Sequence, residues 1–178
     1  MPRGMDGRLV YTMDSDTDAL DFSTQLFSKM DSEIQPIFPA MAGQIFAAVL
    51  VYYMRTFWKT DQSKFNNKEL LRFFSHSTNE DIRNILCLDY MKDYRKCMDY
   101  ISGKSSETQG VNSYLGAVLG KMFIGPFAES CCGREFSMRE VVYGSRKKVL
   151  FIEYDLQRGN VLAPMYGMLI DRALAYAL

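Results

Sequence analysis

The sequence predicts a mainly α-helical fold followed by one β-strand and one helix. The 178 residues are about 1.2 times an average domain of roughly 150 residues. Apolar side chains recur at steps of three and four over most of residues 21–146, as in amphipathic helices. The compact apolar run 149–152 is typical of a strand buried on both faces. We therefore expect a flexible acidic arm over 1–20, an all-α domain over 21–146 and a strand-helix piece over 147–178.

The N-terminal segment has the composition of an arm or a docking loop. Four aspartates stand among Gly, Ser and Thr: Asp6, Asp14, Asp16 and Asp18. Asp21 or Ser23 can cap the first helix, which we expect to run to about Met30. Pro36 and Pro39 then mark the turn into a longer helix.

Residues 37–54 form an uncharged stretch close to the minimum length for crossing a bilayer. Pro39, Gly43, Gln44 and several alanines lower its hydrophobicity, while its larger apolar side chains still follow a helical stripe. We favour a buried core helix that runs to about Lys59, with a transmembrane helix as the alternative.

Shorter helices follow the central helix. Asn66 or Asn67 can cap the segment KELLRFF, and Ser77 with Glu80 has the spacing of a capping box for NEDIRNILCLDY. Residues 90–102 form another amphipathic segment, which the polar loop GKSSETQG separates from the next helix. Asn112 or Ser113 can cap that helix, whose apolar face holds Leu115, Leu119, Met122 and Phe123.

The last fifty residues change character. Ser137 and Glu140 form a second capping-box pattern, and we expect residues 148–155 to form a β-strand. Gly159 and Asn160 turn the chain into a final helix with strict apolar spacing. One strand cannot form a sheet alone, and the last helix has no stop signal, so we expect a truncated chain.

The charge balance excludes binding driven by net charge. Lys plus Arg and Asp plus Glu number 21 each, so no overall field attracts nucleic acid or anionic membranes. A local excess of three positive charges lies between residues 134 and 148. Such a patch can contact phosphates without sequence preference. The candidate DNA contacts are Arg139, Arg146, Lys147 and Lys148. The alternative is an ordinary solvated flank of the strand.

The cysteines and the single histidine do not indicate a metal or a nucleophilic site. Cys87, Cys97, Cys131 and Cys132 form no C-x-x-C pair, and the N-terminus lacks the features of a secretory signal. We expect reduced thiols in a cytosolic protein and no metal. His76 lies between serines, where we favour a surface or capping role.

Two segments resemble nucleotide-binding motifs only in part. Gly116, Gly120 and Lys121 are spaced too closely for a phosphate loop, and Met122 lacks the required hydroxyl. We expect these glycines to allow close helix packing instead. Glu153 and Asp155 alternate with Tyr154 at the end of the expected strand, so both carboxylates could face one active site. A solvated strand end is equally consistent with this pattern.

Beyond these patterns, the chain resembles the type IV secretion coupling proteins, the ring-forming ATPases of bacterial conjugation. The helical segments PAMAGQIFAAVLVYYM and FNNKELLRFFSHSTNEDI resemble the family's inserted all-α domain in order and spacing. A strand of the family's motor domain resembles Phe151 to Leu156, and the turn after it resembles Gly159 and Asn160. The helix that follows resembles the segment with Pro164, Leu169, Ile170 and Asp171.

The resemblance implies that residues 147–178 belong to an incomplete P-loop NTPase (RecA-like) core. The family's Walker A and Walker B motifs would lie outside this chain, so we expect no ATP hydrolysis by it alone and no bound cofactor. ATP and Mg²⁺ serve the full-length family.

The resemblance also implies partners. The family forms hexamers on the cytoplasmic side of the bacterial inner membrane, and its helical domain is implicated in contacts with DNA or relaxosome proteins. The rest of the NTPase domain would be a further partner. The alternative hypothesis is a standalone helical DNA-binding or adaptor protein, and an unrelated metabolic enzyme is the least favoured.

Overall fold

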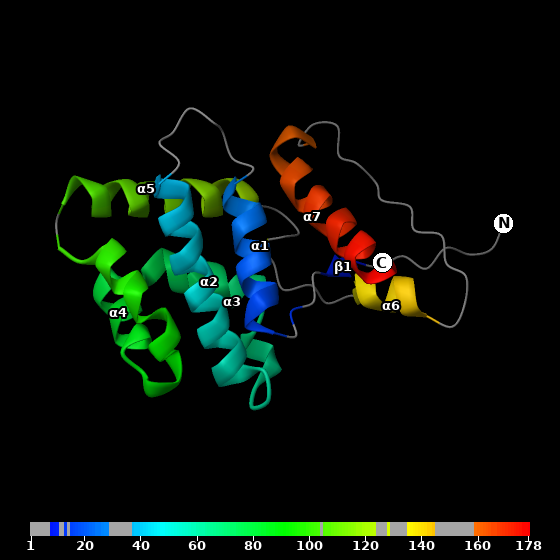
Figure 1. Ribbon diagram of the computed structural model, residues 1–178, viewed down its shortest axis with the longest axis horizontal. Coiled ribbons are helices and arrows are strands. Elements are labelled where there is room, and N and C mark those ends of the chain that lie inside the picture. Colours follow the sequence, from blue (N-terminus) through cyan, green and yellow to red (C-terminus); the bar gives the residue numbers. More distant parts are fainter. Residues whose placement is uncertain are drawn as a thin grey trace. The chain divides into compact units, whose positions relative to one another are not determined.

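The computed structural model describes residues 8–10, 13, 15–28, 37–103, 105–123, 128, 135–144 and 159–178. The chain consists of two compact units. We call Ser15–Ser130 the helical unit, and Met1–Asp14 together with Cys131–Leu178 the split unit. The helical unit is thus a continuous insertion in the sequence of the split unit. Helices dominate the described residues, which confirms the mainly α part of the predicted fold (Figure 1).

The first helix, α1 (Asp16–Ser28), begins five residues before the expected start at Asp21. Its start is set by Ser15 and Asp18, which cap the helix reciprocally. The Ser15 amide donates to Asp18 Oδ2 at 3.0 Å, and the Asp18 amide donates to Ser15 Oγ at 3.3 Å. Sequence reasoning assigned these residues to the acidic arm and so placed the helix too late.

The central helix α2 (Ile37–Phe57) is buried on most of its sides. Ten of its residues, between Ala42 and Tyr53, are buried, as expected for a core helix. By length and composition alone, α2 could also cross a membrane. The core helix of a soluble protein has the same length and composition, and 56% of the most apolar 18-residue stretch of α2 is buried.

Helix α1 runs along α2 (Figure 1), and Gly43 of α2 faces Phe27 and Ser23 of α1. A Cβ at Gly43 would lie 3.4 Å from the Cβ of Phe27. The Ser23 hydroxyl donates a hydrogen bond to the Gly43 carbonyl at this crossing. Next to it, the fully buried Phe46 ring contacts four other rings, at centroid distances of 5.4 to 6.3 Å: Phe22, Phe27, Phe74 and Phe123.

A short turn, η1 (Gln62–Lys64), leads into helices α3 (Asn67–His76) and α4 (Asn79–Leu86). Asn66 caps α3, as one of the two predicted candidates, by accepting the Glu69 amide at 3.0 Å. The capping box of α4 is formed by Thr78 and Asp81. The predicted pair of Ser77 and Glu80 is therefore wrong by one residue, because Ser77 instead closes α3.

The expected amphipathic segment over 90–102 is a 3₁₀ helix, η2 (Asp89–Ile101). Runs of this type longer than about four residues are uncommon. The face toward α2 repeats every three residues through Met91, Tyr94, Cys97 and Tyr100, matching the three-residue turn. The Tyr100 hydroxyl donates to Gln44 Oε1 at 3.0 Å, and the Cys97 thiol lies 3.9 Å from the Gln44 carbonyl oxygen.

Helix α5 (Ser106–Met122) packs on α2. It begins six residues before the expected cap at Asn112, because Ser105 accepts the Thr108 amide at 3.2 Å and caps it instead. A Cβ at Gly110 would come within 2.9 Å of the Phe38 ring. Gly116 and Gly120 have open space around their Cα atoms, so the prediction that they allow close packing is wrong.

In the split unit, strand β1 (Arg8–Val10) pairs in parallel with β2 (Glu135–Ser137). Helix α6 (Met138–Tyr143) follows β2 at once, with the predicted capping box of Ser137 and Glu140. Helix α7 (Gly159–Ala177) packs against α6, and the rings of Tyr143 and Tyr176 lie 5.8 Å apart.

The expected piece of a P-loop NTPase core is wrong for the part of the chain that the structure describes. Its only strands there are β1 and β2, of three residues each, and a pair this short is not a nucleotide-binding sheet. The predicted strand over 148–155 lies outside the described residues. The helix expected after it is present as α7. Strands as short as β1 and β2 have no periodic pattern from which to predict them.

Candidate binding pocket on α2 and α3

One pocket of the helical unit gathers charged, aromatic and imidazole side chains. It has a volume of about 360 Å³ and lies between the C-terminal half of α2 and one face of α3. Its lining residues are Tyr53, Glu69, Arg72, Phe73 and His76. The four residues from α3 are spaced at i, i+3, i+4 and i+7, so they follow one another along a single face of the helix.

The charged pair in the pocket is Glu69 and Arg72, one turn apart on α3. Both Nε and Nη2 of Arg72 contact Glu69 Oε2, at 3.1 and 2.9 Å. The Arg72 side chain is 69% exposed and that of Glu69 is 28% exposed. Among the described residues, no partner contacts Glu69 Oε1. The carboxylate therefore keeps one oxygen available to a ligand.

The single histidine is the last residue of α3. Its ring is exposed, and Nδ1 lies 2.9 Å from the carbonyl oxygen of Arg72. Because a carbonyl oxygen can only accept, Nδ1 carries the proton of the neutral ring. His76 Nε2 is then a hydrogen-bond acceptor. The exposed ring and its backbone contact at the end of α3 agree with the surface or capping role predicted for His76.

The aromatic wall of the pocket consists of Tyr53 and Phe73. Their rings meet edge to face at 6.0 Å. Burial raises the pKa of the Tyr53 hydroxyl above its ordinary value, and the nearby charge of Glu69 raises it further, whereas Arg72 lowers it. Tyr53 therefore stays protonated at neutral pH and presents a neutral hydroxyl beside the Glu69 carboxylate.

A second polar cluster lies where α1, the end of α2 and η2 meet. Arg55 contacts the Asp16 carboxylate and the Tyr90 carbonyl oxygen, and its guanidinium carbon lies 5.6 Å from the Tyr94 ring centroid. The Tyr94 hydroxyl donates to Asp16 Oδ2 at 3.4 Å. Burial, then the charge of Asp16, raises the pKa of Tyr94 to about 12. These groups engage one another, so we interpret the cluster as structural.

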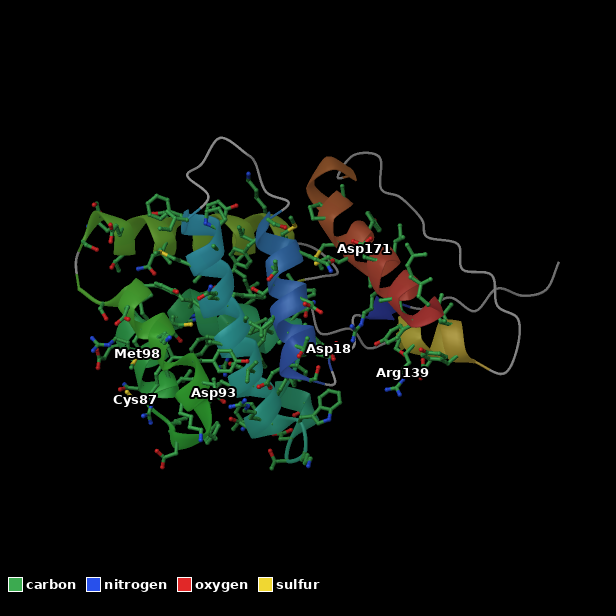
Figure 2. All side chains as sticks on the ribbon, viewed as in Figure 1. Asp18, Cys87, Asp93, Met98, Arg139 and Asp171 are labelled. Carbon is green, nitrogen blue, oxygen red and sulfur yellow. The ribbon has the colours of Figure 1, made fainter. Side chains whose placement is uncertain are left out.

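The structure places few of the predicted site residues. Glu153, Asp155, Arg146, Lys147 and Lys148 lie outside the described residues, so the strand-end carboxylates and most of the basic stretch stay predictions. Arg139 is exposed on α6, and its side chain extends outward from the helix (Figure 2).

Two of the four cysteines can be described. Cys87 is exposed, with its sulfur 3.8 Å from that of Met98, and Figure 2 shows both residues at the rim of the helical unit. Cys97 is a buried thiol, and burial raises its pKa to about 11. The described ranges contain no group of three His, Cys, Asp or Glu side chains that could hold a metal ion.

The pocket was not predicted from the sequence, although four of its five residues have the spacing of one helical face. The spacing of Glu69, Arg72, Phe73 and His76 places charged and aromatic side chains on one helical face. Tyr53 could not be assigned to this group, because only the packing of α3 on α2 brings it there. The charged, aromatic and imidazole side chains of this arrangement can bind a ligand by ion pairing, ring contacts and hydrogen bonds.

Comparisons of the chain with protein-family models, with curated proteins and with solved structures find no match.

Proposed function

We propose that this chain supplies a non-catalytic, partner-binding helical domain to a conjugative DNA-transfer coupling protein. The helical unit would contact a protein of the relaxosome on the cytoplasmic side, and the basic stretch from Arg139 to Lys148 would contact DNA. The proposal includes no nucleotide-binding core in this chain. It starts from the sequence resemblance, which implies an all-α domain inserted into another domain.

The observation that supports it best is the insertion. Ser15–Ser130 form one compact helical unit, and the segments on either side of it belong together in the split unit. The parallel pairing of β1 with β2 ties those flanking segments to each other. This is the chain order of a host domain interrupted by a helical insert.

The distribution of charge favours a protein partner for the helical unit. Residues 15–130 carry 12 Lys or Arg and 14 Asp or Glu, a net charge of −2. The remaining residues carry 9 and 7, a net charge of +2. DNA binding depends on neutralising phosphates with cations, so the split unit is better suited to it than the helical unit.

The test uses the full chain and two charge-removal variants. Fluorescence anisotropy with labelled single- and double-stranded DNA at low salt should show weak, salt-sensitive binding. Combined substitution of Arg139, Arg146, Lys147 and Lys148 by Ala should abolish it. The matched control replaces Lys92, Arg95 and Lys96 of η2 by Ala and should leave binding unchanged. Loss of DNA binding only in the η2 variant would assign DNA contact to the helical unit and contradict the proposal.

The protein partner is tested separately by calorimetric titration with purified relaxosome proteins of the same transfer system. We expect at least one of them to bind the full chain, with affinity that survives the four-residue Ala variant. If none binds, the adaptor role is wrong. ATP hydrolysis by the purified chain would contradict the non-catalytic role.

A further inference from the structure

The pocket on α2 and α3 presents two acceptors to a ligand, beside the exposed Arg72 guanidinium that also lines it. Glu69 Oε1 has no partner among the described residues, and His76 Nε2 is an acceptor in the neutral ring because Nδ1 faces the Arg72 carbonyl oxygen. Ligands that donate several hydrogen bonds and carry positive charge match such a set. Guanidinium and ammonium groups have both properties.

The aromatic side chains of the pocket suit the same ligands. A cation over a Tyr or Phe face within about 6 Å of the ring centroid is attracted by the ring's electrons. Phe73 and Tyr53 line the pocket beside the carboxylate, and the half-buried Phe73 is the more accessible ring because Tyr53 is only 8% exposed. A flexible aliphatic stem could lie along the Phe73 ring while its charged end reaches Glu69.

Arg72 already shows that the Glu69 carboxylate accepts a guanidinium. Its two nitrogens share one carboxylate oxygen, which is not the two-oxygen bidentate geometry of the strongest Arg–carboxylate pairs. Exposed pairs of this kind contribute little to stability, because side-chain entropy and solvent screening offset their attraction. A cation from outside the chain could therefore displace Arg72 and bind both oxygens.

We propose that this pocket binds a basic side chain, Arg or Lys, from the protein partner of the helical unit. The inference rests on the proposed function, and it specifies the chemistry of that partner. The helical unit as a whole carries a net charge of −2, which favours a basic partner over an acidic one. Arg is preferred over Lys, because its planar fork matches a carboxylate and stacks on rings.

The experiment uses three capped tripeptides, Gly-Arg-Gly, Gly-Lys-Gly and Gly-Gln-Gly, as probes. They are titrated into the isotopically labelled full chain, and amide chemical shifts of α3 and the end of α2 are followed by NMR. We expect saturable shifts in the millimolar range for the Arg peptide, weaker binding of the Lys peptide and none of the Gln peptide. Shifts of equal size with all three peptides would overturn the proposal.

Two variants should change the affinity in opposite directions. Glu69→Gln removes the charge with little change in shape, and we expect it to weaken binding of the Arg peptide about tenfold. Arg72→Gln removes the internal competitor, and we expect it to tighten binding about twofold to fivefold. Weaker binding in both variants would indicate general damage to α3 and contradict the displacement step.

A matched control is available on the next helix. Glu80 and Arg83 form the same i, i+3 pair on α4, at 3.7 Å and outside the pocket. Glu80→Gln and Arg83→Gln should leave peptide binding unchanged. If the α4 variants weakened peptide binding as much as the α3 variants, the interaction would be nonspecific charge attraction, and the proposal of a binding pocket would be wrong.

The outcomes also separate this inference from the proposed function. If relaxosome proteins bind the full chain and Glu69→Gln leaves that affinity unchanged, the pocket assignment is wrong and the adaptor role stands. If the Arg peptide binds the pocket but no relaxosome protein binds the chain, the pocket still recognises a basic side chain and the proposed function is wrong.

Discussion

Helices α2 and α3 are neighbours in the helical unit, but they use their side chains in opposite ways. Ten residues of α2 are buried, whereas Leu70 is the only buried residue of α3. Helix α2 is apolar around most of its circumference, and α3 is strongly amphipathic with charged and aromatic side chains on its open face. A largely buried helix can position a neighbour firmly enough for that neighbour to carry the binding chemistry.

The largest expected effect tests the role of α2. Phe46→Ala removes the fully buried ring at the centre of the aromatic cluster, and we expect the free energy of unfolding to fall by about 3–5 kcal/mol. Urea denaturation followed by circular dichroism measures it. Phe73→Ala, at a half-buried ring of α3, is the matched control and should cost less. Equal losses at the two positions would remove the distinction between the helices.

Shielding by α2 should also appear in the reactivity of the two described cysteines. Burial raises the pKa of Cys97 to about 11, two units above the ordinary thiol value of 9.0, so its reactive thiolate is about a hundredfold depleted near neutral pH. With iodoacetamide at pH 8, we expect mass spectrometry to find exposed Cys87 modified well before Cys97. The order should disappear in urea. Rapid modification of Cys97 in the folded chain would show that η2 does not stay against α2.

The smallest effect compares two glycines of α5, one against α2 and one facing solvent. Gly116→Ala should raise the free energy of unfolding by up to about 1 kcal/mol, because Ala favours helix and the site is open. Gly110→Ala should gain less or destabilise, because its Cβ would lie 2.9 Å from the Phe38 ring. Thermal unfolding of both variants measures the difference. An equal gain at Gly110 would show that the α2–α5 contact is looser than described.

The helices of the fold could be predicted from sequence because their signals are local. The apolar stripe of α2, the Asn66 cap and the Ser137 and Glu140 capping box all depend on neighbouring residues. Helix starts were less predictable, since Ser15 and Ser105 stand in polar segments that resemble loops. The short pairing of β1 with β2 joins residues more than a hundred positions apart, which no local pattern records.

The candidate site was predictable only in part. One face of α3 carries four of its five residues, so their spacing was readable, whereas Tyr53 joins them through packing. The resemblance to coupling proteins instead predicted a site at the strand and basic stretch near the C-terminus. Of the four predicted DNA contacts, only Arg139 lies within the described residues.

The 3₁₀ winding of η2 makes this segment longer than an α-helix of the same residues would be. A 3₁₀ helix rises about 2.0 Å per residue and an α-helix about 1.5 Å. The 13 residues of η2 therefore span about 26 Å, where the same residues as α-helix would span about 20 Å. Rewinding would draw its two ends together by about 6 Å and turn Cys97 and Tyr100 away from Gln44. The contacts of Cys97 and Tyr100 with Gln44 of α2 thus favour the longer, 3₁₀ form of η2.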